Sequence, residues 1–133
     1  MTELGKIAED LAAEHYKRHG YTILERNYFP KFGKRMGELD IVCFKNQDLV
    51  FVEVKARTSK RFGSSLEAVD FFKQQKLVKT AKLYIQLHPQ YANYNPRIDV
   101  AAVDIDPAGE RSGGVDNKQE PVIILTNVVE DLN

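Results

Sequence analysis

Three charged residues, Asp40, Glu53 and Lys55, interrupt two apolar runs between Met36 and Arg57. β-Branched and aromatic residues fill both runs, which favours strands over helix. A charge inside an apolar strand loses hydration, so it is expected either to be paired or to serve a function. These three residues are therefore the first candidates for chemistry in the chain.

The spacing of these charges predicts how they meet. If Asn46 and Gln47 form a tight turn between the two strands, Asp40 lies directly opposite Glu53, with Cβ atoms roughly 5 Å apart. Lys55 is two residues beyond Glu53, so it points to the same face. A loop one residue longer would put the carboxylates on opposite faces. The other face of the hairpin carries only apolar side chains, namely Ile41, Cys43, Val50, Val52 and Val54.

Two carboxylates at this distance repel each other unless a proton or a cation lies between them. A hard divalent metal with oxygen ligands would compensate both charges, and a neighbouring lysine could stabilise an anion. The alternative is an ion pair of Lys55 with Asp40 or Glu53 at the end of a buried sheet. Because Asp40 stands at the position that matches Glu53, we expect a metal site.

An amphipathic helix is predicted from Glu3 to about His19, ahead of this hairpin. Thr2 is its expected N-cap and Gly20 its expected stop. Glu9 lies off the apolar stripe among mostly small residues, which would let another element come close. On periodicity alone, Glu9 is a solvated surface residue. The expected apolar stripe consists of Leu4, Ile7, Ala8, Leu11, Ala12 and His15.

The remaining chain predicts a mixed sheet flanked by helices, of the α/β class, with the element order α-β-β-β-α-β-β. The further strands are expected at 21–28, 97–105 and 121–129. A long helix is expected from Ser65 to about Leu87, and a mobile acidic loop at 106–120. The long helix has an expected buried face of Val69, Phe72, Leu77, Ala81 and Tyr84, and a basic stripe of Lys73, Lys76, Lys79 and Lys82.

The composition limits the class of protein. A chain of 133 residues is long enough for one domain, which we assign to residues 1–133. We expect no membrane partner, because no apolar run approaches the ~20 residues needed to span a bilayer. The N-terminus lacks the apolar core of a signal peptide, and the lone cysteine, Cys43, cannot form an internal disulfide. Both features indicate a cytoplasmic protein.

The net charge is zero, which argues against a strongly basic nucleic-acid coat protein. Acidic residues concentrate from Asp104 onward, however, so a basic face on the main body remains open. Its expected nucleic-acid-binding residues flank the candidate site and continue onto the long helix: Lys31, Lys34, Arg35, Arg57, Lys60, Arg61, Lys73 and Lys76.

Asp40 followed by Glu53-Val54-Lys55 resembles the signature of restriction-endonuclease-like nucleases, the PD-(D/E)xK superfamily, although Leu39 stands where that motif names proline. More closely, the chain resembles the YraN-like uncharacterised bacterial family, which is similar to archaeal Holliday-junction resolvases. The resemblance extends to about Val103 and rests on residues 5–12, 20–21, 26–28, 37–42, 50–57, 62–73 and 97–100.

The resemblance implies a restriction-endonuclease-like fold and a role for each matching residue. Asp40, Glu53 and the Val54 carbonyl would hold Mg²⁺ or Mn²⁺, and Lys55 would orient or activate the attacking water. Glu9 matches the superfamily's first-helix acid and would join the site.

The implied function is a metal-dependent endonuclease that acts on DNA, including branched or damaged DNA. A homodimer would be a natural way to cut both strands. The alternatives are a non-catalytic nucleic-acid-binding protein that kept the fold and a phosphohydrolase with a small substrate.

Overall fold

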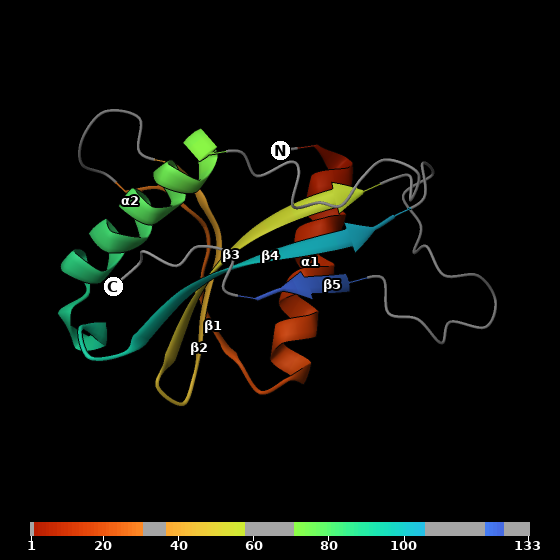
Figure 1. Cartoon of the computed structure of the whole chain (residues 1–133). Coiled ribbons are helices and arrows are strands. Elements are labelled where there is room, and N and C mark those ends of the chain that lie inside the picture. Colours follow the sequence, from red (N-terminus) through yellow and green to blue (C-terminus); the bar gives the residue numbers. More distant parts are fainter. Residues whose placement is uncertain (1, 31–36, 58–70, 106–121, 127–133) are drawn as a thin grey trace.

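The computed structural model describes residues 2–30, 37–57, 71–105 and 122–126. It shows a five-stranded mixed sheet in the order β1-β2-β3-β4-β5, with one long helix on each face (Figure 1). The parallel pair is β3 and β4, and the other neighbours are antiparallel. The α/β class and the element order predicted from the sequence are confirmed. The elements are α1 (Glu3–Arg18), β1 (Thr22–Tyr28), β2 (Leu39–Lys45), β3 (Asp48–Arg57), α2 (Phe71–Leu87), the 3₁₀ helix η2 (Pro89–Tyr91), β4 (Asn95–Asp104) and β5 (Val122–Leu125).

The β2–β3 hairpin has the register predicted from a two-residue turn. Lys45 pairs with Asp48 and Ile41 pairs with Val52. Asn46 adopts a left-handed backbone conformation with φ of 54°, which asparagine tolerates better than most residues. The turn therefore fixes which side chains share a face along the whole hairpin.

The predicted ends of α1 are also confirmed. The Thr2 hydroxyl accepts a hydrogen bond of 2.9 Å from the Gly5 backbone N–H and so caps the helix. After the helix, Gly20 has φ of +90°, a conformation that side chains with a Cβ rarely adopt. A residue with a Cβ at this position would also lie 3.3 Å from Lys45 Cε.

Each face of the sheet has its own hydrophobic core. The face under α1 buries Ala8, Ala12 and Tyr16 of the helix against alternate residues of the strands, as predicted for the apolar face of the hairpin. The face under α2 buries Leu77, Ala81 and Tyr84. Asp40, Glu53 and Lys55 occupy strand positions that alternate with the α1 face. They therefore belong to the α2 side of the sheet.

The prediction that Phe72 lies on the buried face of the long helix is wrong. Its side chain is 77% exposed. It lies five residues before Leu77, which is about 140° away around an α-helix. Lys73 instead shares the side of α2 that carries Leu77, Ala81 and Tyr84, at intervals of four and three residues.

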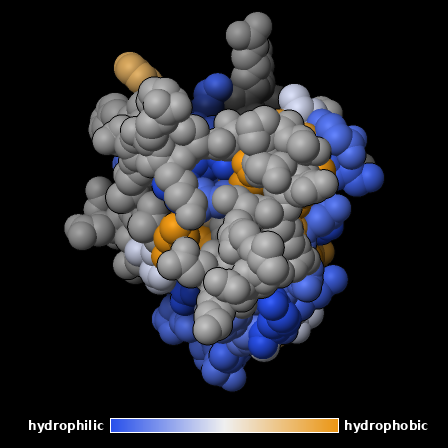
Figure 2. Space-filling view, turned by 90° about the vertical axis from the view of Figure 1, so that its right-hand side faces the viewer, coloured by the Kyte–Doolittle hydropathy of each residue, from blue (hydrophilic) through white to orange (hydrophobic). Residues whose placement is uncertain are grey.

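Several expectations fall on residues outside the described parts. These are the basic residues at 31–35 and at 60–61, the start of the long helix with Val69, the acidic loop at 106–120 and the end of the last strand. On the face shown in Figure 2, the described residues are mostly hydrophilic, and hydrophobic ones form small separate patches. No helix in the described parts is long and apolar enough to cross a membrane.

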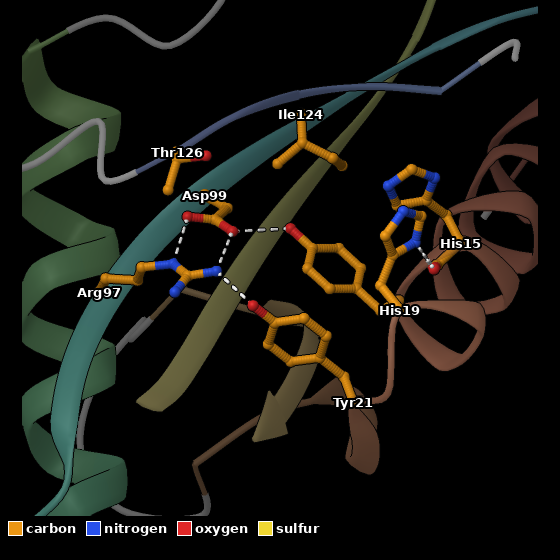
Figure 3. A pocket seen from close by; sticks show the side chains of 8 residues that line it. His15, His19, Tyr21, Arg97, Asp99, Ile124 and Thr126 are labelled. Carbon is orange, nitrogen blue, oxygen red and sulfur yellow. Dashed lines mark hydrogen bonds and ion pairs between the residues drawn. The ribbon is translucent and has the colours of Figure 1, made fainter. Parts of the chain in front are cut away.

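A polar network ties α1 to β4 at the end of the helix away from Glu9 (Figure 3). Asp99 is fully buried and accepts hydrogen bonds from the Tyr16 hydroxyl at 2.8 Å and from Arg97 Nε at 3.0 Å. Arg97 also donates to the Tyr21 hydroxyl at 2.8 Å. Because these groups satisfy one another, the network compensates a buried charge and fixes the position of the helix on the sheet.

We predict that Asp99→Asn destabilises the protein by about 2–4 kcal/mol, because it removes the buried anionic partner of the half-buried Arg97 guanidinium and leaves it the half-exposed Asp48. Urea denaturation at neutral pH measures this loss. Asp48→Asn is the matched control, since Asp48 is half-exposed and lies 3.7 Å from the same guanidinium. An Asp99→Asn effect no larger than that of the control would contradict the structural role of the network.

Candidate functional site

The backbone pairing between β2 and β3 ends beside Asp40, whose side chain accepts the next hydrogen bond from β3. Ile41 and Val52 form the last backbone pair at this end of the ladder. One residue further, Asp40 Oδ2 accepts a hydrogen bond of 2.8 Å from the Val54 N–H. The confirmed register, continued by one residue, puts Asp40 opposite Glu53. The two strands therefore bring both predicted carboxylates to one face, at the point where the strands separate.

The Asp40 carboxyl is poorly solvated and lies in a negative field. Burial raises its pKa first, and the Glu53 charge raises it further, to about 7. Glu9 and Glu38 add smaller contributions of the same sign, and the Val54 N–H opposes them. Near neutral pH, the Asp40 carboxyl is therefore partly protonated, and a cation could replace that proton.

Two lysines compensate Glu53, which is buried. Lys55 Nζ lies 3.5 Å from Glu53 Oε1, and Lys73 Nζ of α2 lies 2.5 Å from the same oxygen. Burial lowers the pKa of Lys55, and the neighbouring Lys73 lowers it further. Burial also acts to lower the pKa of Lys73, but the hydrogen bonds to Glu53 and Lys55 and the charges of Glu53 and Asp40 together outweigh this effect, and the net direction is upward. The site therefore favours the charged form of Lys73 and disfavours that of Lys55.

Glu9 reaches the same region from α1. It is only 7% exposed, so its assignment as a solvated surface residue is wrong. Burial raises its pKa, and Glu38 raises it further, while Arg26 and a hydrogen bond with Asn27 lower it. Glu9 Oε1 and Asn27 Oδ1 are both buried and have no hydrogen-bond partner in the described parts of the chain. Helical periodicity missed this burial because Ala8, Ala12 and Ala13 let the sheet approach the helix closely.

The oxygen atoms at this end of the sheet fit a hard divalent cation. Glu9 Oε1 and Asn27 Oδ1 are acceptors without donors, and Asp40 is a carboxyl whose ionisation is held back by negative neighbours. Oxygen acceptors that lack donors are the ligand type that Mg²⁺ and Mn²⁺ prefer. Among the described residues, no group of three His, Cys, Asp or Glu side chains is arranged to hold a metal ion. A cation here would therefore need backbone or water ligands as well, and Glu53 would have to exchange its lysine partners.

The residues predicted to bind nucleic acid have different environments. Arg57 donates two hydrogen bonds to the Asp104 carboxylate, from Nε and Nη2. Lys73 contacts Glu53, whereas Lys76 is exposed on α2. Lys31, Lys34, Arg35, Lys60 and Arg61 lie outside the described residues.

Sequence reasoning missed two features of the site. Glu38 adds negative charge to Glu9 and Asp40, and its position two residues before Asp40 was the available signal. The contact of Lys73 with Glu53 was missed because Lys73 was counted with the exposed lysines of α2. The helical phase that it shares with Leu77 and Ala81 could have revealed it.

A cavity of about 170 Å³ lies beside the Asp99 network and is lined by residues such as His15, His19 and Thr126 (Figure 3). The Asp99, Arg97, Tyr16 and Tyr21 groups that line it already bond to one another. This cavity is therefore not the candidate site.

Residues 8–103 match the model of a family described as "Uncharacterised protein family UPF0102". The chain is 43% identical over 104 residues to a UPF0102 protein of Caldanaerobacter subterraneus, which covers 78% of this chain and 81% of the relative. It is 51% identical over 89 residues to a UPF0102 protein of Syntrophomonas wolfei, which covers 67% of this chain and 74% of the relative. A UPF0102 protein of Stutzerimonas stutzeri is 43% identical over 99 residues, covering 74% and 79%. The matched span includes Glu9, Asp40, Glu53, Lys55 and Lys73.

The raised pKa of Asp40 has a consequence for stability. In the folded protein the pKa is about 7, against 3.8 for an unperturbed aspartate, so the folded state binds more protons between these values. Stability should therefore fall as the pH rises from about 4 to 7. We predict that Asp40→Asn, which removes this titration, stabilises the metal-free protein at pH 8 by about 1–3 kcal/mol.

Chemical denaturation in the presence of a chelator, at pH values from 4.5 to 8, measures this effect. The difference between Asp40→Asn and the parent should grow with pH. Asp48→Asn, a half-exposed residue at the other end of β3, should show no such growth. A parent protein that is more stable than Asp40→Asn at pH 8 would contradict the assignment of a charge-crowded carboxyl.

Proposed function

The chain belongs to the UPF0102 family, and we propose that it is a metal-dependent endonuclease that hydrolyses phosphodiester bonds in DNA. One observation carries the proposal. Asp40 and Glu53 meet at the end of the β2–β3 hairpin, with Lys55 on the same face. This arrangement agrees with the resemblance of these residues to the PD-(D/E)xK signature. Glu9 supports it, because a buried acid of α1 contributes to the same negative field.

We assign Asp40 and Glu53 as the principal ligands of Mg²⁺ or Mn²⁺, helped by Glu9. The Val54 carbonyl is a further ligand in the proposal. In an extended strand a residue directs its N–H and C=O to the same side, and the Val54 N–H points to Asp40. A divalent cation supplies Lewis acidity and offsets the charge that builds up on phosphate oxygens during hydrolysis.

Lys55 has the properties of a group that handles the attacking water. Its ammonium group lies 3.5 Å from Glu53, and burial together with Lys73 lowers its pKa. In the charged form it can stabilise an anionic phosphate oxygen, and in the neutral form it can accept a proton from water. A lysine with a lowered pKa gives up its proton more readily than a surface lysine does.

The proposed substrate is DNA, including branched or damaged DNA, and a homodimer would bring two sites to two strands. We place this activity in the cytoplasm, because the single cysteine is a free buried thiol in β2. The described cations near the site include Lys55, Lys73, Lys76, Arg57 and also Arg26, whose Nη2 lies 3.9 Å from Glu9 Oε1. The remaining basic residues of the proposed DNA surface are Lys31, Lys34, Arg35, Lys60 and Arg61.

We predict that the purified protein cleaves DNA in the presence of Mg²⁺ or Mn²⁺ and that the double variant Asp40→Asn with Glu53→Gln loses at least about 100-fold in rate. A panel of single-stranded, duplex, flap and four-way substrates measures the rates and gives the structural preference. Glu9→Gln should lower the rate less, because Glu9 only helps the principal ligands Asp40 and Glu53 in the proposal and its charge affects Asp40 less than that of Glu53. Asp10→Asn, an exposed acid one residue along α1, is its matched control.

The controls separate the proposal from its alternatives. Titration calorimetry with Mn²⁺ should show binding by the parent and none by the double variant. DNA binding without cleavage by a parent protein that does bind Mn²⁺ would replace the proposal with a non-catalytic nucleic-acid-binding function. Hydrolysis of small phosphate esters without cleavage of DNA would indicate a small-substrate phosphohydrolase.

We also predict a modest salt dependence for DNA binding. Each lysine that neutralises a phosphate of duplex DNA contributes about −0.9 to the slope of log K against log salt concentration. Lys76 is exposed on α2 and belongs to the proposed DNA surface, so Lys76→Ala should reduce the magnitude of this slope by about 0.9. Fluorescence anisotropy with the Asp40→Asn protein avoids cleavage during the measurement. Lys17→Ala on α1 is the control and should leave the slope unchanged.

A further inference from the structure

Lys73 differs from the other lysines of α2. Lys76, Lys79 and Lys82 are exposed, whereas Lys73 lies in phase with the buried residues Leu77 and Ala81. Its Nζ contacts Glu53 Oε1 at 2.5 Å, closer than the 3.5 Å contact from Lys55. α2 therefore delivers an ammonium group to the carboxylate that the proposed function assigns to a metal.

Both lysines contact Glu53 through the same oxygen, Oε1. A divalent cation on this carboxylate would lie within a few ångströms of two ammonium groups and would repel them strongly in a poorly hydrated site. Binding of a cation through Glu53 would therefore be easier if one of the two lysines moved away. Lys55 belongs to a strand of the sheet interior, paired with β4 on one side. Lys73 lies in the first turn of the described part of α2.

The way α2 is attached to the sheet favours Lys73 as the group that moves. Leu77, Ala81 and Tyr84 are buried, and the Thr80 hydroxyl accepts a hydrogen bond of 3.0 Å from the N–H of Gly37, two residues before β2. These contacts hold α2 one turn or more beyond Lys73. The long lysine side chain can thus leave Glu53, and residues 71–76 lose this anchor, while the helix from Leu77 onward keeps its place.

We propose that Lys73 is a positioning residue that serves as the resident counter-ion of Glu53 in the metal-free protein and exchanges with the divalent cation when it binds. The inference rests on the proposed metal site, in which Lys73 would compete with the metal ion for Glu53. The exchange keeps the buried carboxylate compensated in both states. It also frees an ammonium group beside the site, where a phosphate of the nucleic acid can accept it.

The test is the affinity for Mn²⁺ of Lys73→Met, which keeps the length of the side chain and removes its charge. Competition predicts that this variant binds Mn²⁺ roughly three- to tenfold more tightly than the parent. Lys79→Met is the matched control, because it removes the same charge from an exposed position of the same helix. Titration calorimetry or the electron paramagnetic resonance signal of free Mn²⁺ gives the affinities.

The outcomes distinguish this inference from the proposed function. Equal or weaker Mn²⁺ binding by Lys73→Met, with binding by the parent that Asp40→Asn and Glu53→Gln abolish, would overturn the exchange and leave the metal site in place. No Mn²⁺ binding by the parent would overturn both. If Lys79→Met gained the same Mn²⁺ affinity, the effect would come from the change in net charge alone, and the exchange would be overturned.

A second measurement uses the unaltered protein, so it does not depend on how the variant folds. Hydrogen exchange of the backbone amides of α2 should speed up severalfold at residues 71–76 when Mg²⁺ is added, because that end of the helix loses its contact with Glu53. Residues 80–87 should not change. Unchanged or slower exchange at residues 71–76 in saturating Mg²⁺ would overturn the inference.

Discussion

The structure depends on the compensation of several carboxylates at one end of the sheet. Glu53 is held by two lysines, Glu9 by Arg26 and Asn27, and Asp40 by a backbone N–H and by a pKa near neutrality. Each acid is poorly hydrated, so each needs a partner, and the partners come from different elements. Asp40, with a pKa near neutrality, is compensated partly by a proton, which a metal ion could replace. The site is thus balanced without a metal, and in the proposed function a divalent cation takes the place of that proton.

The register of the β2–β3 hairpin decides whether this balance can exist. A shift of one residue would turn Asp40 into the α1 core and leave Glu53 beside no acid. The two-residue turn and the apolar face of Ile41, Cys43, Val50 and Val52 both oppose such a shift, because it would expose the apolar set. The apolar residues of the hairpin therefore fix the geometry of the charged ones. In the same way, the Asp99 network helps to position Glu9, because it holds the C-terminal part of α1 on the sheet.

The fold and the central pair could be predicted because their signals are local. Strand periodicity and the Asn46-Gln47 turn specify Asp40 opposite Glu53 without knowledge of any distant contact. Glu9 could not be derived in this way, because its burial depends on how closely alanine residues let the sheet approach α1. The resemblance to a nuclease family, and not periodicity, drew attention to it. The bidentate contact of Arg57 with Asp104 joins two strands distant in sequence, and no short-range pattern indicates it.

Lys73 shows how a regular pattern can conceal a different role. Four lysines at intervals of three suggest one basic stripe, but a helix turns by 3.6 residues, so the stripe drifts around the helix. The first member of the series is carried onto the side that faces the sheet, and the next three remain in solvent. Phe72 is displaced to the exposed side by the same geometry. The helix thus places a cation where hydrophobicity alone would predict a core residue, and the buried Glu53 makes that placement stable. In the proposed function, the affinity of the site for a metal ion therefore depends on this lysine as well as on the carboxylates.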